Sequence, residues 1–339
     1  MQGIGRIQEV TGENVKVDAK DLKIIYLLTR DSRMPLSEIA KQVTLSRDSV
    51  SYRIKRLQEK GVIQRFFPVL NYKYFNLNVF HVFMIIDERY KEEYSKLLEL
   101  LENHPNVLSM MEYNDHWDIH VSLVAKNVRD FDSIMTDITT RFPNVIVEKD
   151  ILENINNYKM EFLPYISDIK HDLKAVTKKP YSLDEKDLKI LQVISNNTRL
   201  SAYEIGNHIS VDADTVSYRI KKMIDAGIIK RFTTLVNFSK LKYHWYTFGI
   251  QMKTFDHKHE KSFQQYISSV PNIIRAVKTL GVWDVLLYIV VNDTKEFHRI
   301  IKGIKSQFYD ITKMSEAWIA YREHFYNPMP KVLYDRPVA

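Results

Sequence analysis

The sequence predicts an α+β protein in which one two-domain unit, a winged helix-turn-helix followed by a ferredoxin-like βαββαβ domain, occurs twice. Residues 18–71 match residues 184–237 at 21 of 54 positions without a gap. Within each copy, apolar residues first recur at helical spacing and later alternate as in strands. A period of 166 residues, from Asp18 to Asp184, is typical of a duplicated domain pair and not of a solenoid repeat.

Each copy begins with three predicted helices. In the first copy, Asp18 and Asp21 begin a helix, Pro35 begins a short second one, and Ser46 is a favourable N-cap for a third that ends before Gly61. Residues 62–69 follow as an extended wing. Three helices with a tight turn between the second and third, followed by a wing, predict winged helix-turn-helix domains over 17–73 and 183–239.

The segments that follow have the order of strands and helices that is typical of a sheet domain. In the first copy, strands are predicted at 80–87, 107–113, 117–125 and 145–152, with helices at 88–103 and 128–142. The order β-α-β-β-α-β is the ferredoxin-like split motif. It predicts sheet domains over 78–158 and 243–326. The remaining segments are interpreted as an N-terminal tail (1–16), a linker (159–182) and a C-terminal tail (327–339).

Composition restricts the function classes. The chain contains no cysteine, which excludes disulfides, thiolate metal sites and cysteine nucleophiles and suits a reducing cytoplasm. No apolar run approaches the roughly 20 residues of a membrane span, and the first residues lack a signal-peptide core. The histidine pairs His116/His120 and His257/His259 have no further clustered ligands, so a surface position is favoured over a metal site. We expect a cytoplasmic protein with no membrane association, metal, cofactor or catalytic residues.

The charge alternates along the chain. The net charge is +7, and the balances of residues 18–73, 78–158, 184–239 and 244–324 are +6, −8, +1 and +3. A basic first helix-turn-helix favours a polyanionic partner. The opposite balances of the two sheet domains favour pairing with each other over self-pairing. We therefore expect a single-chain pseudo-dimer or a homo-oligomer.

The third helix of each helix-turn-helix is the predicted recognition helix, whose first two turns would face base edges. In the first copy, Val50, Ile54 and Leu57 mark its inner face. The alternative for the outward face is a simple solvated surface. The candidate DNA-binding residues of this helix are Ser46, Arg47, Asp48, Ser51, Tyr52, Arg53, Lys55 and Arg56.

The second recognition helix offers a weaker set. Its candidates are Ser217, Tyr218, Arg219, Lys221 and Lys222. Asp212 and Ala213 replace Ser46 and Arg47, and carboxylates at a helix entrance oppose the approach of phosphate. For Arg53 and Arg219, a structural or backbone-phosphate role is favoured over base reading.

These motifs resemble the N-terminal domain of the Lrp/AsnC family. The resemblance rests on Asp-x-x-Asp-x-x-Ile from Asp18, Arg33, Glu38-Ile39-Ala40, Leu45-Ser46, Arg53-Ile54-x-x-Leu57 and Gly61-Val62-Ile63. It continues into the sheet domains and so spans nearly the whole chain, twice. It implies a transcriptional regulator of double-stranded DNA, not an enzyme, whose sheet domains pair back to back and often bind an amino acid between subunits.

The resemblance also implies an effector site. The family's Gly-x-x-Asp turn between the second and third strands matches Gly281 to Asp284, whereas the first copy has Asp115 in place of the glycine, followed by Asp118. The candidate effector-binding residues are therefore Gly281, Asp284 and Asp118. Turn capping is the alternative role for both aspartates.

A second family with the same two-domain build, the siroheme decarboxylases, provides the alternative function. In that family a histidine and an arginine near the second and third strands face the tetrapyrrole. Residues 112–117 here contain one histidine, His116, and no arginine, and residues 279–283 contain neither. A basic recognition helix is also not needed by such an enzyme. We therefore expect a DNA-binding regulator in preference to a decarboxylase.

Overall fold

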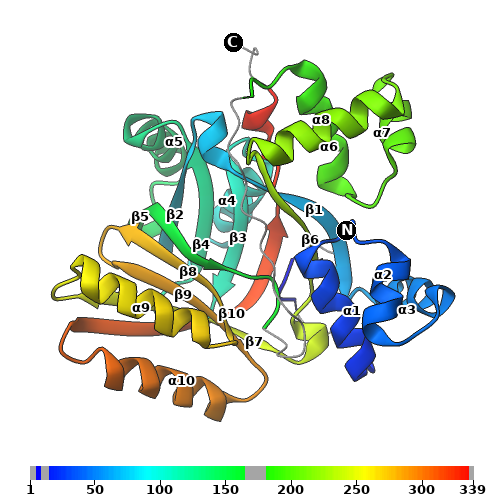
Figure 1. The fold of residues 1–339 in the computed structure, drawn as a ribbon. Helices are drawn as coiled ribbons and strands as arrows, with labels where there is room; N and C mark the ends of the chain where they lie inside the picture. The colour runs from blue at the N-terminus through cyan, green and yellow to red at the C-terminus, as the bar shows by residue number, and fades with distance from the viewer. Residues whose placement is uncertain (1–4, 9–14, 165–180, 336–339) are drawn as a thin grey trace. The chain divides into compact units, whose positions relative to one another are not determined.

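The computed structural model describes residues 5–8, 15–164 and 181–335 (Figure 1). These residues form two compact units, and each unit combines the same domain from both repeats. The helix-turn-helix unit contains residues 15–76, 181–237 and 327–335. The sheet unit contains residues 5–8, 77–164 and 238–326. The α+β architecture predicted from the sequence is confirmed.

The helix-turn-helix unit contains two copies of the predicted three helices. The first copy comprises α1 (Ala19–Arg30), α2 (Leu36–Val43), α3 (Arg47–Glu59) and β1 (Ile63–Leu70), followed by the short helix η1 (Tyr72–Phe75). The second comprises α6 (Glu185–Asn196), α7 (Ala202–Ile209), α8 (Ala213–Asp225) and β6 (Ile229–Val236). Asp18 and Asp21 form a capping box at α1, and Asp184 and Asp187 form the same box at α6.

The segment expected as a wing is a strand whose partner lies in the other repeat. β1 pairs antiparallel with β6, from Ile63 opposite Val236 to Leu70 opposite Ile229. Asn71 N donates to Ile228 O and Asn237 N donates to Val62 O, both at 2.9 Å. These two bonds join equivalent residues of the repeats in exchanged roles. The two helix-turn-helix copies are therefore related by an approximate two-fold axis.

The sheet unit also contains two copies of its predicted elements. The first comprises β2 (Asn78–Ile86), α4 (Lys91–Asn103), β3 (Val107–Tyr113), β4 (Ile119–Ala125), α5 (Val128–Arg141) and β5 (Ile146–Met160). The second comprises β7 (His244–Met252), α9 (His257–Ser269), β8 (Ile273–Leu280), β9 (Val285–Val291), α10 (Thr294–Gln307) and β10 (Thr312–Tyr326). The short helix η2 (Ser239–Leu241) precedes β7, whereas η3 (Lys331–Leu333), which follows β10 in the chain, belongs to the helix-turn-helix unit.

The two four-stranded sheets join at both edges into a closed barrel of order β10-β3-β4-β2-β5-β8-β9-β7. The last strand of each copy makes the connection, because β5 pairs with β8 and β10 pairs with β3. β5 is therefore longer than the strand expected at 145–152. Lys159 and Met160, which were assigned to the linker, are part of it and pair with Ala276 and Arg275. Residues 165–180 of that linker lie outside the described residues.

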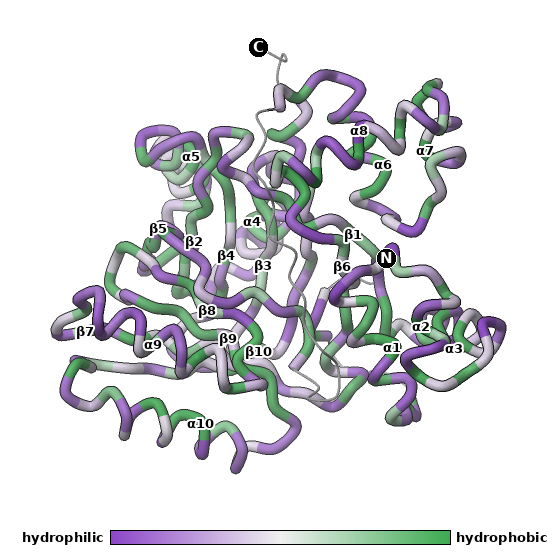
Figure 2. The backbone as a smooth tube through the Cα atoms, viewed as in Figure 1, coloured by the Kyte–Doolittle hydropathy of each residue, from purple (hydrophilic) through white to green (hydrophobic). Residues whose placement is uncertain are grey.

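Alternation along the strands separates two environments. In β2, Phe80, Val82 and Met84 pack with α4 and α5 in one hydrophobic cluster, while His81 and Phe83 lie on the opposite side. The second copy has an equivalent cluster under α9 and α10. Figure 2 shows α10 alternating hydrophobic and hydrophilic segments, as a helix with one buried face must.

Both segments interpreted as tails are packed against the domains. In the sheet unit, the Arg6 guanidinium is buried and forms an ion pair with buried Glu323, while Glu323 N donates to Ile7 O at 2.8 Å. In the helix-turn-helix unit, Tyr72 Oη donates to Pro328 O at 2.9 Å, and Leu333 is buried. Residues 5–8 and 327–335 are therefore integral parts of the fold. The sequence offered no periodic pattern in these short segments.

Candidate nucleic-acid interface

The first recognition helix, α3, has the division of faces that the sequence predicts. Ser46 accepts a hydrogen bond from Ser49 N at 3.1 Å and so begins the helix. Val50, Ile54 and Leu57 are buried on its inner face. The predicted residues that are exposed are Ser46, Arg47, Asp48, Ser51, Tyr52 and Lys55. Tyr52 is 68% exposed, so its ring and hydroxyl are accessible to a partner.

Two of the predicted DNA contacts, Arg53 and Arg56, are instead engaged within the domain. Arg53 Nη1 lies 2.7 Å from Asp18 and 2.8 Å from Asp21, and Arg56 also forms an ion pair with Asp21. The hydrogen bond to Asp18 raises the pKa of Arg53. Because the Asp21 side chain is only 1% exposed, these contacts fasten α3 to the start of α1. Arg53 and Arg56 therefore share the same kind of contact, an ion pair with an aspartate at the start of α1.

The second recognition helix, α8, repeats the pattern with less free positive charge. Ser217, Tyr218 and Lys221 are exposed. Arg219 is engaged like Arg53, 2.8 Å from Asp184 and 3.0 Å from Asp187. Lys222 lies over the ring of Tyr218, 5.2 Å from its centroid.

The entrance of α8 is acidic. Asp212 accepts a hydrogen bond from Thr215 N at 2.7 Å and is the N-cap. Hydrogen bonds from the Thr215 side chain and then from its backbone lower the pKa of Asp212, so the carboxylate keeps its charge at neutral pH. Ser46 performs the same capping at α3 without a charge. The charge difference that the sequence suggested between the two recognition helices, which we call the first and second reading heads, therefore lies at equivalent capping positions.

The predicted effector residues have structural roles. Asp284 accepts from Met252 N at 2.7 Å, and Asp118 accepts from Ile86 N at 2.6 Å, so each carboxylate joins the start of one strand to the end of its neighbour. Gly281 has φ +151°, and a Cβ atom there would lie 2.6 Å from Ile151 O. The glycine is thus required by the close approach of β5. In the first copy, Asp115 accepts from Ile319 N of β10 at 2.7 Å.

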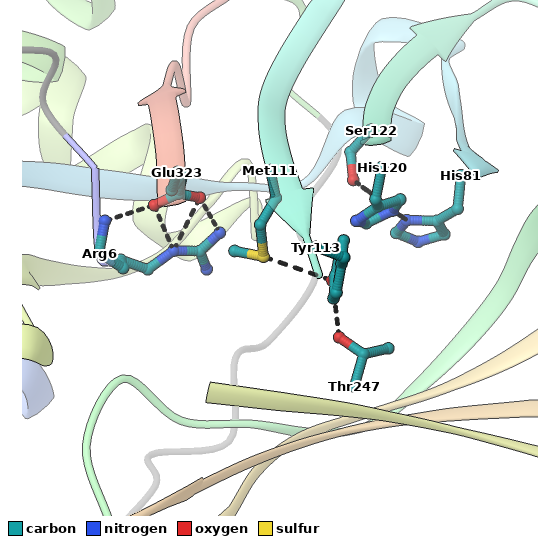
Figure 3. A network of polar contacts seen from close by, with 8 residues as sticks. All are labelled: Arg6, His81, Met111, Tyr113, His120, Ser122, Thr247 and Glu323. Atoms are coloured by element: carbon teal, nitrogen blue, oxygen red, sulfur yellow. Dashed lines mark hydrogen bonds and ion pairs between the residues drawn. The ribbon is translucent and has the colours of Figure 1, made fainter. Parts of the chain in front are cut away.

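A polar network inside the sheet unit was not predicted (Figure 3). His81 Nδ1 lies 3.0 Å from His120 Nε2 and 3.1 Å from Ser122 Oγ. Tyr113 Oη lies 2.7 Å from Thr247 Oγ1, which connects the two repeats. The only sequence signal was the position of His81 and His120 on the strand face opposite the helix-packed residues, which a single sequence does not distinguish from an exposed face.

Burial determines the protonation of this network. Burial, with the positive charges of Arg275 and Arg6, lowers the pKa of His120 to about 3. Burial, with His120 and Arg275, places the pKa of His81 well below its ordinary value. Both imidazoles are therefore neutral at physiological pH, and one can donate its hydrogen to the other.

The surface position expected for the four histidines considered as metal ligands is wrong for His120, which is buried because β4 carries it on the side opposite the helix-packed residues. His120 is buried against His81, while His116 is partly exposed and lies 4.0 Å from Glu316. His259 contacts Asp256 at 2.9 Å. Over residues 5–8, 15–164 and 181–335, no group of three or more metal-ligating side chains occurs. Within the same residues, no helix is long and apolar enough to cross a membrane.

Comparison with known proteins supports the helix-turn-helix assignment. A family model described as winged helix-turn-helix DNA-binding matches residues 17–64 and 183–230. The HTH-type transcriptional regulator FL11 of Pyrococcus furiosus is 31% identical over 119 residues, which cover 35% of this chain and 78% of the regulator. A transcriptional regulator of this type from Mycobacterium tuberculosis is 25% identical over 124 residues, 37% of this chain and 83% of its own length.

Similarity over nearly the whole chain is found with a solved structure. The siroheme decarboxylase NirDL has a TM-score of 0.62 at 10% identity, covering 93% of this chain and 97% of that one. Its complex with an iron-uroporphyrin III analogue has a TM-score of 0.60 at 11% identity, covering 92% and 93%. At such identity the likeness establishes a shared two-repeat fold and leaves function open.

Proposed function

Because the chain belongs to the Lrp/AsnC family of helix-turn-helix regulators, we propose that it is a sequence-specific DNA-binding transcriptional regulator and not an enzyme. The observation that carries the proposal is helix α3. Its apolar side is buried, while Arg47, Ser51, Tyr52 and Lys55 form an exposed polar and basic face. This is the arrangement that a helix needs to enter the major groove.

The proposed functional form is a single-chain pseudo-dimer. Antiparallel pairing of β1 with β6 holds the two helix-turn-helix copies as a pair, which supports reading of two half-sites by one chain. We propose that the first head dominates affinity. Arg47 and Lys55 are exposed there, whereas α8 begins with the carboxylates of Asp212 and Asp214.

We extend the proposal to a small amino acid as effector at the turn from Gly281 to Asp284. A carboxylate can accept several hydrogen bonds, so Asp284 can bind an ammonium group in addition to Met252 N. The first repeat carries Asp115 at the glycine position, so a side chain stands where the turn glycine of the second repeat has none. One site per chain is therefore expected. Calorimetry across the common amino acids checks this, and two equal sites per chain would contradict it.

A tetrapyrrole enzyme is the second candidate. It is favoured by the likeness of the whole two-repeat build to NirDL, and opposed by the absence of an arginine from residues 112–117 and 279–283. The proposed regulator, in contrast, does not require a bound tetrapyrrole.

One pair of measurements on the full chain separates the two candidates. An electrophoretic mobility shift on the DNA upstream of the protein's own gene, with unrelated DNA as competitor, should reveal a specific complex that weakens as salt rises. Absorbance titration with an iron-uroporphyrin should give no saturable spectral change. Saturable tetrapyrrole binding without a specific DNA complex would overturn the proposal in favour of the enzyme.

A further inference from the structure

Two seams join the sheets of the repeats, and three equivalent positions carry a polar network at each. We define the first seam as β3–β10 and the second as β8–β5. At the first seam, Tyr94 of α4 donates to Glu112 of β3 at 2.8 Å, and His324 of β10 lies 2.9 Å from the other oxygen of Glu112. The equivalent residues at the second seam, 166 positions away, are Glu260 of α9, Lys278 of β8 and Tyr158 of β5.

The second network uses the opposite distribution of charge. Lys278 Nζ lies 2.9 Å from Glu260, and Tyr158 Oη donates to the other oxygen of Glu260 at 2.5 Å. The carboxylate is thus on the helix at the second seam and on the strand at the first. Accordingly, β5 contributes the phenol of Tyr158 to the second seam, whereas β10 contributes the imidazole of His324 to the first.

If β5 replaced β10 beside β3, the polar side chains at the first seam would no longer complement one another. If β5 from a second copy of the first repeat replaced β10, Tyr158 would take the place of His324. Glu112, whose side chain is only 7% exposed, would lose His324 and also Tyr321, a further hydrogen-bond partner on β10 at whose position β5 carries Ile155. A carboxylate at that degree of burial requires a favourable set of partners.

The shapes of the turns beside the seams also favour β10 over β5 as the partner of the first repeat. At the second seam, β5 approaches so closely that a Cβ atom at position 281 would lie 2.6 Å from Ile151 O. The first repeat has Asp115 at this position, and its carboxylate accepts from Ile319 N of β10. The turn of the first repeat therefore fits β10 but would clash with β5 in the arrangement of the second seam.

We propose that these features make strand pairing at the two seams specific, and we call this specificity the pairing code of the sheet unit. The β3 edge accepts β10, the β8 edge accepts β5, and the β3 edge rejects β5 from another copy of the chain. The partner that fits the first repeat is thus the second repeat and not a copy of itself. This inference concerns the sheet unit and is independent of DNA binding.

Cross-linking tests the code in the full chain. The absence of native cysteine removes background disulfides. Glu153 and Leu280 are antiparallel partners across the second seam, and such partners lie within disulfide range. A chain with Glu153→Cys and Leu280→Cys should form this disulfide. In self-pairing of the first repeat, residue 153 would instead lie opposite residue 114, the equivalent of residue 280.

The matched chain carries Glu153→Cys and Asn114→Cys and should form no disulfide-linked dimer. Formation of the 153–114 disulfide between chains as completely as the 153–280 disulfide would overturn the proposal. Both positions of each pair are at least partly exposed, so oxidation reports pairing and not access.

Hydrogen exchange tests the residues of the code. Lys278→Glu and Gly281→Asp place first-repeat residues in the second seam, whereas His298→Asp places a first-repeat residue at an exposed position of α10 and is the control. We expect amides of β5 and β8 to exchange at least about tenfold faster in the seam variants, with β2 and β4 unchanged. Exchange as slow as in the control would contradict the code. If all strands exchanged faster, the sheet itself would be lost and the cross-linking result would decide.

Discussion

Arg33 and Arg199 occupy equivalent positions in the two repeats, and each donates from Nη1 to main-chain carbonyls of the other repeat. Arg33 bonds Thr198 O at 2.7 Å, and Arg199 bonds Ser32 O at 2.7 Å. Between them, the Ser32 and Thr198 hydroxyls are 2.6 Å apart. The reciprocity is that of a symmetric dimer interface, built here within one chain.

This relationship predicts that Arg33→Ala or Arg199→Ala loosens the pair of reading heads. Loss of charge-assisted bonds to buried carbonyls should lower the free energy of unfolding by about 1–3 kcal/mol, measured by urea denaturation. DNA affinity should fall with it, because the two heads no longer share a fixed spacing. Lys186→Ala, at an exposed position of α6, is the control. Unchanged stability in both arginine variants would show that these bonds are dispensable.

The salt dependence of DNA binding should identify the phosphate contacts. We expect Arg47→Ala and Lys55→Ala each to reduce the slope of log affinity against log salt by about one unit. Lys221→Ala should have a smaller effect because Asp212 and Asp214 lie at the same helix entrance. Arg56→Ala should also change the slope less, since Arg56 is paired with Asp21. Equal losses from Lys55→Ala and Lys221→Ala would remove any functional meaning from the charge asymmetry.

The buried histidines predict loss of stability in mild acid. The pKa values of His81 and His120 are depressed in the folded protein, whereas an exposed histidine has a pKa of about 6.5. The unfolded chain therefore binds more protons below pH 6.5, and the free energy of unfolding falls as pH falls from there towards the folded values. The expected slope is about 1.4 kcal/mol per pH unit for each histidine.

A matched variant isolates this effect. His81→Thr with His120→Leu introduces the residues that the second repeat carries at the equivalent positions, Thr247 and Leu286. Urea denaturation between pH 7.5 and pH 5 should give a flatter profile for the variant than for the unaltered protein. His104, whose pKa is also lowered by burial, remains in both and contributes equally. Parallel profiles would show that the two histidines do not control acid stability.

The ion pair of Arg6 with Glu323 predicts that the N-terminal segment is required for stability. Arg6→Ala leaves a buried carboxylate unpaired and should cost about 3–5 kcal/mol in the free energy of unfolding. Replacing both residues, as Arg6→Leu with Glu323→Leu, should cost less because no charge is left without a partner. Thermal unfolding of the three chains checks this order. A double variant as unstable as the single one would point to lost packing and not to the charge.

The sequence by itself determined the repeat, the element types and the inner faces of the helices. Spacings such as Val50, Ile54 and Leu57 and caps such as Ser46 act within a few residues, so a local pattern was sufficient. The same local reasoning placed the carboxylates of Asp212 and Asp214 at the entrance of α8.

Only the tertiary structure decided which groups meet across the fold. Asp21 and Arg53 are separated by 32 residues, and Arg6 and Glu323 by 317, so no local spacing reveals that each pair neutralises itself. The requirement for glycine at position 281 is likewise non-local, because a Cβ atom there would meet Ile151 O, which lies in the other repeat. Charge and close packing act between neighbours in space, and a sequence pattern records only neighbours along the chain.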